Sequence, residues 1–409
     1  MIKEQLKEAK KACRFMQNVK PEVKNKALQN ISEALIQKSE LIIQENQKDI
    51  AEAKNNGIKE SMVDRLLLNK ERIEAMAKDI LKVIDLQDPI GTLVREIKRP
   101  NGLVIQQIKI PLGVIGVIYE SRPNVTVDIA SLCIKTNNVC VLKGGKEAIH
   151  SNRILVQIIN EAIQDVLPTH TVTLIETKKR EETLDLIQAH DYVDVIIPRG
   201  SAGLIQYVVK NATVPVIETG AGICHLYVDQ DASLDMALEI AKNAKIQRPS
   251  VCNAIETILV HQKVAPEFLP KLQELFKNVQ IYGDEKTRKI IDCLEATEKN
   301  YATEYDDYIC NIKVVDDIEE AIEHIYNYST KHSESIITEN KETAKYFMES
   351  LDSACVYHNA STRFSDGGQF GFGAEVGIST QKLHARGPLG LQEITSTKYM
   401  IYGNGQVRS

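Results

Sequence analysis

Two hydrophobic periodicities divide the chain. Over the first 85 residues, apolar side chains recur at helical spacing, as at Leu28, Ile31 and Leu35, and the stretch 62–84 repeats the pattern. This spacing predicts amphipathic helices, and Pro21 can open one of them at its first turn. From residue 111 to about 228, short β-prone runs alternate with helical stretches. That alternation predicts a parallel sheet covered by helices on both faces.

The second region holds five candidate strands, which are Val114–Tyr119, Val139–Leu142, Val172–Ile175, Val193–Ile197 and Val214–Ile217. Helices are expected between them, for example at 154–166 and 181–189. A second α/β unit is expected after Asp229, with helices at 234–244 and 318–326 and strands near 255–260, 312–315, 335–337 and 354–356. In such sheets ligands bind beyond the carboxyl ends of the strands, so we expect the chemistry in the turns there.

Asn101-Gly102 lies between two β-prone arms within residues 94–110, which is a strong signal for a β-hairpin. An isolated hairpin is only marginally stable in water, so this one is expected to pack against another domain or subunit. Residues 397–402 form a last strand-like run.

Composition narrows the function classes. The 409 residues predict two or three domains, and a net charge of −6 argues against non-specific nucleic-acid binding. No run is long enough for a membrane span, and the charged start lacks a signal-peptide core. The eight cysteines form no Cys-x-x-Cys pair and no Cys/His cluster at metal spacing. We therefore expect reduced thiols in the cytoplasm and no metal site.

One cysteine, Cys252, has an unusual setting. Pro249 and Ser250 break the chain before it, and residues 255–260 after it predict a buried strand. A cysteine at such a junction can face a cleft, where its thiolate is a strong nucleophile near neutral pH. The alternative is a buried cysteine that packs as a small hydrophobe.

Polar and glycine-rich turns fall where the strands are expected to end, at 120–124, 143–146, 198–201 and 218–222. The dinucleotide motif G-x-G-x-x-G is absent, and a glycine-rich loop spans 364–375. The turns and the cysteine together resemble the aldehyde dehydrogenase superfamily through Lys143-Gly-Gly-Lys146, Arg199-Gly-Ser201, Glu218-Thr-Gly-Ala-Gly222 and Cys252. Cys252 follows Glu218 by 34 residues, the separation which that superfamily uses. Nearly the whole chain looks like its γ-glutamyl phosphate reductase subfamily, through segments 120–128, 247–253 and 379–388.

The resemblance implies an α/β fold with a Rossmann-type parallel-sheet cofactor domain, an α/β catalytic domain and a β-hairpin oligomerisation flap. The implied boundaries are 1–94 and 111–225 for the NADP-binding domain, 226–375 for the catalytic domain, and 95–110 and 376–409 for the flap and C-terminal segment. It also implies a homo-oligomer and a possible association with a glutamate 5-kinase.

The implied reaction is the NADPH-dependent reduction of L-glutamyl 5-phosphate to L-glutamate 5-semialdehyde and phosphate, in proline biosynthesis. Cys252 would attack the acyl phosphate and carry the acyl group as a thioester. The Cys252 N–H and the Asn124 side chain are candidate donors to the oxyanion, although Asn124 is equally suited to capping the following helix. Glu218, which activates water in hydrolytic relatives, is expected here to serve structure, positioning or proton traffic.

The implied cofactor residues are Lys143 at the adenosine ribose, Gly200 and Ser201 at the pyrophosphate, Gly220, and Glu304 at the nicotinamide ribose. The NAD users of the superfamily place a glutamate where Lys146 stands. A cation cannot accept hydrogen bonds from the ribose hydroxyls but can pair with a 2′-phosphate, so NADP(H) is favoured. The alternative for Lys146 is a solvated lysine at a helix start.

The substrate carries a carboxylate, an ammonium and a phosphate, and the cationic candidates for it are Arg122, Arg363, Arg386 and the adjacent His384. Each arginine is equally suited to an interdomain salt bridge. Three other functions stay open from sequence alone. One is a broader aldehyde or acyl-CoA dehydrogenase, one is a cofactor-free thiol hydrolase pairing Cys252 with His261 or His384, and one is an inactive binding scaffold.

Overall fold

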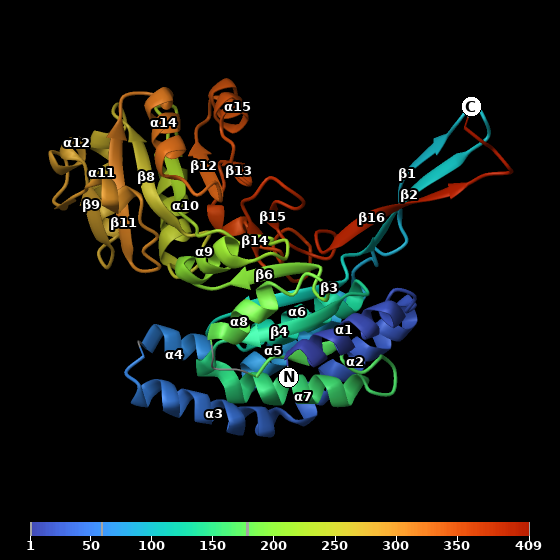
Figure 1. Cartoon of the computed structure of the whole chain (residues 1–409). Helices are drawn as coiled ribbons and strands as arrows, with labels where there is room; N and C mark the ends of the chain where they lie inside the picture. Colours follow the sequence, from blue (N-terminus) through green and yellow to red (C-terminus); the bar gives the residue numbers. More distant parts are fainter. Residues whose placement is uncertain (1, 59, 177–179, 409) are drawn as a thin grey trace. The chain divides into compact units, whose positions relative to one another are not determined.

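A computed structural model of the protein describes residues 2–58, 60–176 and 180–408, and the chain forms two compact units. The first unit comprises Met1–Thr219, Gly371–Gly377 and Leu389–Ser409. The second comprises Gly220–Phe370 and Ile378–Pro388. Figure 1 labels their helices and strands along the chain.

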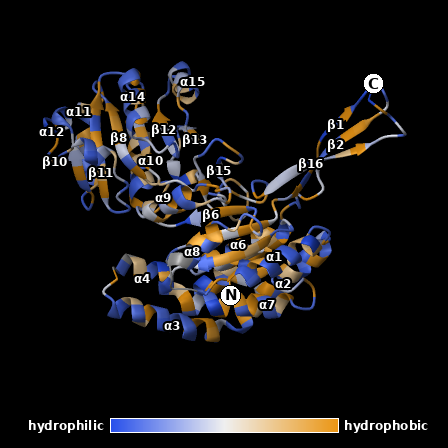
Figure 2. Ribbon diagram, in the orientation of Figure 1, coloured by the Kyte–Doolittle hydropathy of each residue, from blue (hydrophilic) through white to orange (hydrophobic). Residues whose placement is uncertain are grey.

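The N-terminal part of the first unit is helical, as its periodicity predicts. Pro21 is the first residue of the second helix, where its missing N–H costs no hydrogen bond. Figure 2 shows orange and blue residues mixed along these helices, in keeping with one buried apolar stripe on each. The helices are α1 (Ile2–Met16), α2 (Pro21–Gln37), α3 (Ser39–Asn55), α4 (Glu60–Leu66) and α5 (Lys70–Asp85).

A parallel sheet follows, in the order β5-β4-β3-β6. Every residue of β3 is buried, because helices α6 and α7 and the N-terminal helices cover this sheet. The strands are β3 (Val114–Tyr119), β4 (Val139–Gly144), β5 (Val172–Leu174) and β6 (Val195–Arg199). The helices are α6 (Asn124–Lys135), α7 (Ile149–Ile163), α8 (Arg180–Ile187) and α9 (Ala202–Asn211), with a short 3-10 turn, η1 (Lys146–Ala148).

The expected fifth strand at Val214–Ile217 is wrong. This segment makes only one isolated parallel bridge, between Val216 and Ile196. Pro215 has no N–H to donate to a ladder, so the segment attaches to β6 through the Pro215 carbonyl, which accepts from Ile196 N, and through Ile217 N.

The second unit is built around a seven-stranded sheet in the order β10-β9-β11-β8-β7-β12-β13, in which every pair is parallel. β7 and β8 are buried throughout. The strands are β7 (Cys224–Val228), β8 (Ile255–His261), β9 (Gln280–Gly283), β10 (Leu294–Glu295), β11 (Ile309–Val315), β12 (Ser333–Ile337) and β13 (Cys355–His358). The helices are α10 (Leu234–Ile246), α11 (Ala265–Leu275), α12 (Glu285–Arg288), α13 (Glu298–Tyr301), α14 (Ile318–Tyr328), α15 (Lys341–Ser350) and the 3-10 turn η2 (Thr362–Phe364). A short pair, β14 (Ile378–Ser379) and β15 (Gly387–Pro388), completes this unit.

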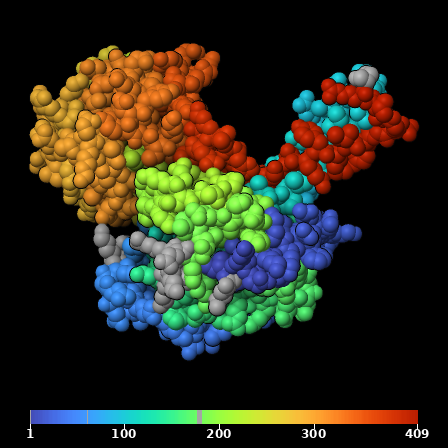
Figure 3. Space-filling view, viewed as in Figure 1, coloured from blue at the N-terminus to red at the C-terminus, as the bar shows by residue number. Residues whose placement is uncertain are grey.

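The predicted hairpin is confirmed. β1 (Leu93–Lys98) and β2 (Val104–Pro111) pair in antiparallel fashion around a turn in which Gly102 has a φ of 89°. The last strand, β16 (Thr395–Tyr402), pairs with the other edge of β2, so three strands form this flap sheet. Figure 3 shows these strands, cyan and red, packed side by side.

Candidate functional site

Three of the four predicted turns meet at the carboxyl edge of the first sheet. After β3, the backbone N–H of Glu120 donates to Arg199 O at 3.1 Å, which joins this turn to the end of β6. The Glu120 carboxylate accepts from Ser201 N at 2.8 Å. The Glu147 carboxylate, just after β4, accepts from Ser121 N at 2.7 Å. Parallel strands therefore bring these polar turns to one edge, as the alternation of strands and helices predicts.

Lys143 and Lys146 lie on this edge, at the end of β4 and at the start of η1. Lys143 is half-buried, and burial lowers the pKa of its ammonium while the charges of Glu147 and Glu120 oppose that shift. Lys146 is exposed. Between them, a Cβ on Gly144 would stand 2.0 Å from Nδ2 of the buried Asn152, so any larger residue there would force the Asn152 side chain to move.

Gly200 and Ser201 form the junction between β6 and α9. The Ser201 hydroxyl caps the helix by accepting from Leu204 N at 3.4 Å. A carboxylate already lies at this helix start, since Glu120 accepts from the Ser201 N–H. The N-terminus of α9 thus favours negative charge, as helix N-termini do.

Asn124 does not cap α6, because the N-cap position is Pro123 and has no side-chain bond. Instead, Nδ2 of Asn124 donates to Oδ2 of Asp128 at 3.0 Å, one turn further along the helix. Burial raises the pKa of Asp128 to about 7, and the negative charges of Asp79 and Glu375 act in the same direction. Asn124 and Arg199 oppose the shift. Arg122, two residues before Asn124, is half-buried.

In the second unit, Cys252 lies half-buried in the turn that leads into β8. Two contacts fix its peptide. The thiol of Cys224 on β7 donates to Cys252 O at 3.2 Å. The backbone at Gly222 passes so close that a Cβ there would stand 1.5 Å from the same oxygen. Gly222 N in turn donates to Oε1 of Glu304 at 2.7 Å, so Glu304 holds the glycine segment against the cysteine turn.

Asn253, the residue after Cys252, is almost fully buried and binds the segment around η2. Its Nδ2 donates to Ser365 O at 2.8 Å and to Arg363 O at 3.3 Å. Its Oδ1 accepts from Nη1 of Arg363, and the Arg363 Nε donates to Oε1 of Gln247 at 3.1 Å. Arg363 is therefore held between two amide oxygens, beside the predicted nucleophile.

Arg386 is engaged elsewhere in the second unit. Its guanidinium donates to Oδ1 of Asp352 at 2.9 Å, to Asp352 O and to Thr380 O. Lys382 and Arg386 together hold the pKa of Asp352 well below its usual range. Arg386 therefore forms a salt bridge within its own unit, and the neighbouring His384 is exposed.

His261 cannot serve as a base for Cys252. It is the last residue of β8, whereas Cys252 precedes the first, so roughly 20 Å of extended strand separates them. Its Nδ1 accepts from Lys263 N at 3.1 Å.

Glu218 and Gly220 lie on either side of the boundary between the units. Glu218 is half-buried, and the next side chain, Thr219, donates to Pro198 O at 2.5 Å. Gly220 N donates to Ile378 O at 3.3 Å.

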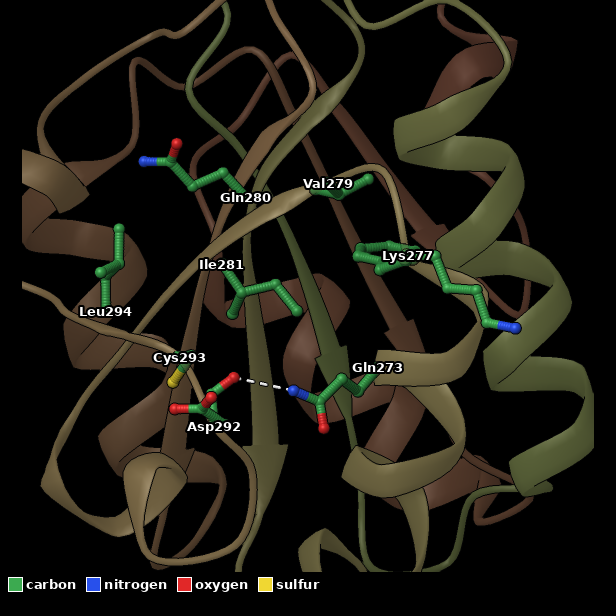
Figure 4. Close-up of a pocket in the computed structure, with 9 residues that line it drawn as sticks. Gln273, Lys277, Val279, Gln280, Ile281, Asp292, Cys293 and Leu294 are labelled. Atoms are coloured by element: carbon green, nitrogen blue, oxygen red, sulfur yellow. Dashed lines mark hydrogen bonds between the residues drawn. The ribbon is translucent and has the colours of Figure 1, made fainter.

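A separate hollow opens on the second unit between the end of α11 and strands β9 and β10 (Figure 4). Gln273 donates across it to Asp292 O at 2.7 Å, and Cys293 is in its lining. None of the predicted site residues lines it, so this hollow is not the site predicted from the sequence.

A model of the aldehyde dehydrogenase family matches residues 1–291. The chain belongs to the aldehyde dehydrogenase family. It is 52% identical over 415 residues to the γ-glutamyl phosphate reductase of Halothermothrix orenii, covering all of this chain and 99% of the relative. It is 54% identical to that of Petrotoga mobilis, over 98% of this chain and 97% of the relative.

Solved structures agree with this family fold. The crystal structure of γ-glutamyl phosphate reductase from Thermotoga maritima matches with a TM-score of 0.96 and 48% identity, over 99% of each chain. An acetylating aldehyde dehydrogenase from Geobacillus thermoglucosidasius, 16% identical, matches with a TM-score of 0.74 and shares the fold. The predicted α/β fold class with parallel sheets is confirmed. Among the described residues, no helix is long and apolar enough to cross a membrane, and no His, Cys, Asp and Glu side chains group as a metal site.

Membership of the family implies a nicotinamide cofactor, and the edge of the first sheet fits one. Lys143 and Lys146 supply cations there, and the start of α9 carries a carboxylate where an anionic pyrophosphate would be favoured. The Glu120 carboxylate uses the Ser201 N–H, so an anion that needs this donor must displace Glu120.

Sequence reasoning missed four residues that shape these sites: Glu120, Glu147, Asp128 and Asn253. Glu120, Asp128 and Asn253 all lie inside segments that resemble the family, within four residues of Arg122, Asn124 and Cys252, respectively. A polar residue flanking a candidate site residue is the available signal, but it does not reveal which partner the side chain binds.

Proposed function

We propose that the chain catalyses the NADPH-dependent reduction of L-glutamyl 5-phosphate to L-glutamate 5-semialdehyde and phosphate, a step of proline biosynthesis. The observation that carries this proposal is the full-length identity of 52–54% to curated γ-glutamyl phosphate reductases. The setting of Cys252 supports it, because a half-buried thiol with its peptide held by Cys224 and Gly222 is suited to a nucleophile of fixed position.

In this proposal, the Cys252 thiolate attacks the γ-acyl carbon of the substrate. The bond from carbon to the phosphate oxygen breaks, and a thioester and phosphate form. The backbone N–H of Cys252 donates to the oxyanion, and we assign the second donor to Asn124. When bound, NADPH would supply the hydride that reduces the thioester carbonyl, and release of the semialdehyde would return Cys252 as the thiolate that began the cycle.

We propose NADP(H) as the preferred cofactor. Lys146 is exposed at the first position of η1, three residues after the half-buried Lys143. A cation at that place can pair with a 2′-phosphate but cannot accept hydrogen bonds from a ribose diol. Lys146→Glu should therefore weaken NADP+ binding more than NAD+ binding in fluorescence titrations. Equal effects on the two cofactors would remove the support for this preference.

The reverse reaction tests the proposed function. With pyrroline-5-carboxylate, NADP+ and inorganic phosphate, the protein should form NADPH, and omission of phosphate should abolish the signal. Cys252→Ser should lose this activity, whereas Cys293→Ser, at the separate hollow, should retain it. A protein that needs coenzyme A instead of phosphate would be an acyl-CoA reductase, and one that needs neither would be an aldehyde oxidiser.

We also propose that the protein forms a homo-oligomer through the flap sheet. Its two edge strands are open for pairing, and they expose large apolar side chains at Leu93, Val94, Tyr399, Ile401 and Tyr402. Burial of these side chains against a second copy would remove that apolar surface from water.

A further inference from the structure

Arg363 contacts both ends of the segment 247–253, which contains Arg248 and Cys252. Its Nε donates to Oε1 of Gln247, the residue before Arg248, and its Nη1 donates to Oδ1 of Asn253, the residue after Cys252. Arg363 projects from η2, and Arg248 lies in the loop after α10, four residues before the cysteine. Burial lowers the pKa of the Arg363 guanidinium, and the positive charge of Arg248 lowers it further, so the two cations repel one another. Negative charge on Cys252 acts in the opposite direction. The hydrogen bond from Arg363 to Asn253, the residue after Cys252, places the guanidinium at the cysteine turn.

No carboxylate neutralises this pair by an ion pair within residues 2–58, 60–176 and 180–408. Arg363 donates instead to two neutral oxygens, from Gln247 and Asn253. The negative charge of Asp366 favours protonated Arg363, but its carboxylate accepts from the backbone N–H groups of Gly368 and Gln369. The amide contacts orient the guanidinium without cancelling its charge.

An anion would relieve the repulsion. Guanidinium groups bind phosphate through paired N–H donors, and a dianion matches two of them. Arg363 uses Nε and one Nη1 hydrogen for the amide contacts, so the other N–H donors of its guanidinium take no part in the bonds to Gln247 and Asn253. This anion would lie beside the sulfur of Cys252, where an acyl phosphate must place its leaving group.

We propose that Arg248 and Arg363 form the site that holds the phosphate of the substrate, and that Asn253 is the positioning residue that orients Arg363. The inference rests on the proposed function and names a part of its site. As the sulfur–carbon bond forms and the carbon–oxygen bond breaks, the electron pair passes to the phosphate oxygen. The guanidinium groups stabilise this charge, and the proton given up by the Cys252 thiol balances the release of hydrogen phosphate.

The test is the KM for inorganic phosphate in the reverse reaction, measured beside the KM for pyrroline-5-carboxylate. Arg248→Gln should raise the KM for phosphate by roughly ten- to a hundredfold, the effect of losing one charge-assisted contact, and should leave the other KM within about twofold. Arg248→Lys should recover part of the loss. Arg288→Gln, which removes the same charge on α12, is the matched control and should match the wild type.

Asn253→Asp tests the positioning role. A carboxylate at this place would pair with Arg363 and compete with phosphate, so the KM for phosphate should again rise. A purely structural role for Asn253 predicts lower thermal stability with an unchanged KM for phosphate, which would overturn the assignment of Asn253.

The binding of phosphate can be measured without catalysis, through the rate at which Cys252 is alkylated. Inorganic phosphate should slow the alkylation of Cys252 by iodoacetamide in the wild type and in Arg288→Gln, but not in Arg248→Gln. Suppose that the wild type requires phosphate, and that Arg248→Gln has the wild-type KM for phosphate and the same protection of Cys252 by phosphate. The assignment of the phosphate site would then be wrong, while the proposed function would stand. If the wild type requires no phosphate, the proposed function itself fails.

Discussion

The contact between Gly222 and the Cys252 carbonyl makes a demanding prediction about catalysis. In Gly222→Ala, the new methyl carbon would stand 1.5 Å from Cys252 O and 2.3 Å from its carbonyl carbon. A carbon and a carbonyl oxygen normally lie about 3.3 Å apart, so the two segments must separate by about 1.8 Å. Neither obstacle is a flexible side chain, because both atoms belong to the backbone of the cysteine turn.

Two effects of different size follow. Forced overpacking costs roughly 1–3 kcal/mol of stability, which a unit with a seven-stranded core can absorb while remaining folded. A shift of about 1 Å in a reacting group costs about a hundredfold in rate. Gly222→Ala should therefore stay folded while its kcat in the reverse assay falls at least about a hundredfold.

The assay pairs kcat with thermal unfolding and with the rate of Cys252 alkylation. Gly203→Ala is the matched control, since nothing lies within 4 Å of a Cβ there and the residue is helical. It should keep its activity and gain up to about 1 kcal/mol of stability. Wild-type kcat in a folded Gly222→Ala would refute the idea that this glycine fixes the nucleophile.

Four further predictions concern other parts of the chain. Burial raises the pKa of Asp128 to about 7. Between about pH 4 and 7, Asp128 is therefore protonated in the folded state and ionised in the unfolded chain. The free energy of unfolding consequently falls as the pH rises through this range. Asp128→Asn should therefore lose less stability than the wild type between pH 5 and 8 in urea unfolding, and equal losses would contradict this. Lys245→Met should lower the free energy of unfolding by about 3–5 kcal/mol, because it leaves the buried carboxylate of Glu256 without its cation. In the wild type, Oε2 of Glu256 lies 2.7 Å from the Lys245 Nζ. The double variant Lys245→Met, Glu256→Leu should recover most of that stability. Ile401→Lys should shift the protein to a smaller species in light scattering, whereas an unchanged mass would exclude this face from the oligomer interface. Glu218→Gln should leave NADPH-independent hydrolysis of the acyl phosphate unchanged, and a lower rate would show that Glu218 activates water.

Much of the fold follows from local pattern. β3 is buried on both faces and is an unbroken apolar run, so it was predictable nearly to the residue. β8 is also buried throughout, and its apolar residues Ile258, Leu259 and Val260 were enough to predict a strand there. The segment 214–217 has similar composition but carries Pro215, and its outcome depends on one missing N–H. The apolar composition of this segment predicts a strand, but Pro215 cannot donate a ladder hydrogen bond. The missing hydrogen bond determines the outcome, and the segment makes only an isolated bridge.

The site was predictable only in part, for a different reason. Turns at strand ends can be placed because topology brings them to one edge. The partner of a side chain cannot be placed in this way, since Asn253 and Arg363 are 110 residues apart in sequence and Glu120 is 81 residues from Ser201. The salt bridge between Arg386 and Asp352 could not be predicted for the same reason. Nothing in the sequence near either residue indicates that the two side chains pair.

The flap sheet has a consequence for biosynthesis of the chain. The Gln107 side chain on β2 donates to the Thr397 hydroxyl on β16, 290 residues later, so the second neighbour of β2 is synthesised long after β2 itself. Protein synthesis adds about 5–20 residues per second, so one edge of β2 stays unpaired for roughly 15–60 s. During translation, an open edge of this kind is a target for pairing with other nascent chains or for protection by chaperones. Synthesis of β16 therefore closes the sheet, and deletion of β16 would leave every copy with that edge of β2 exposed.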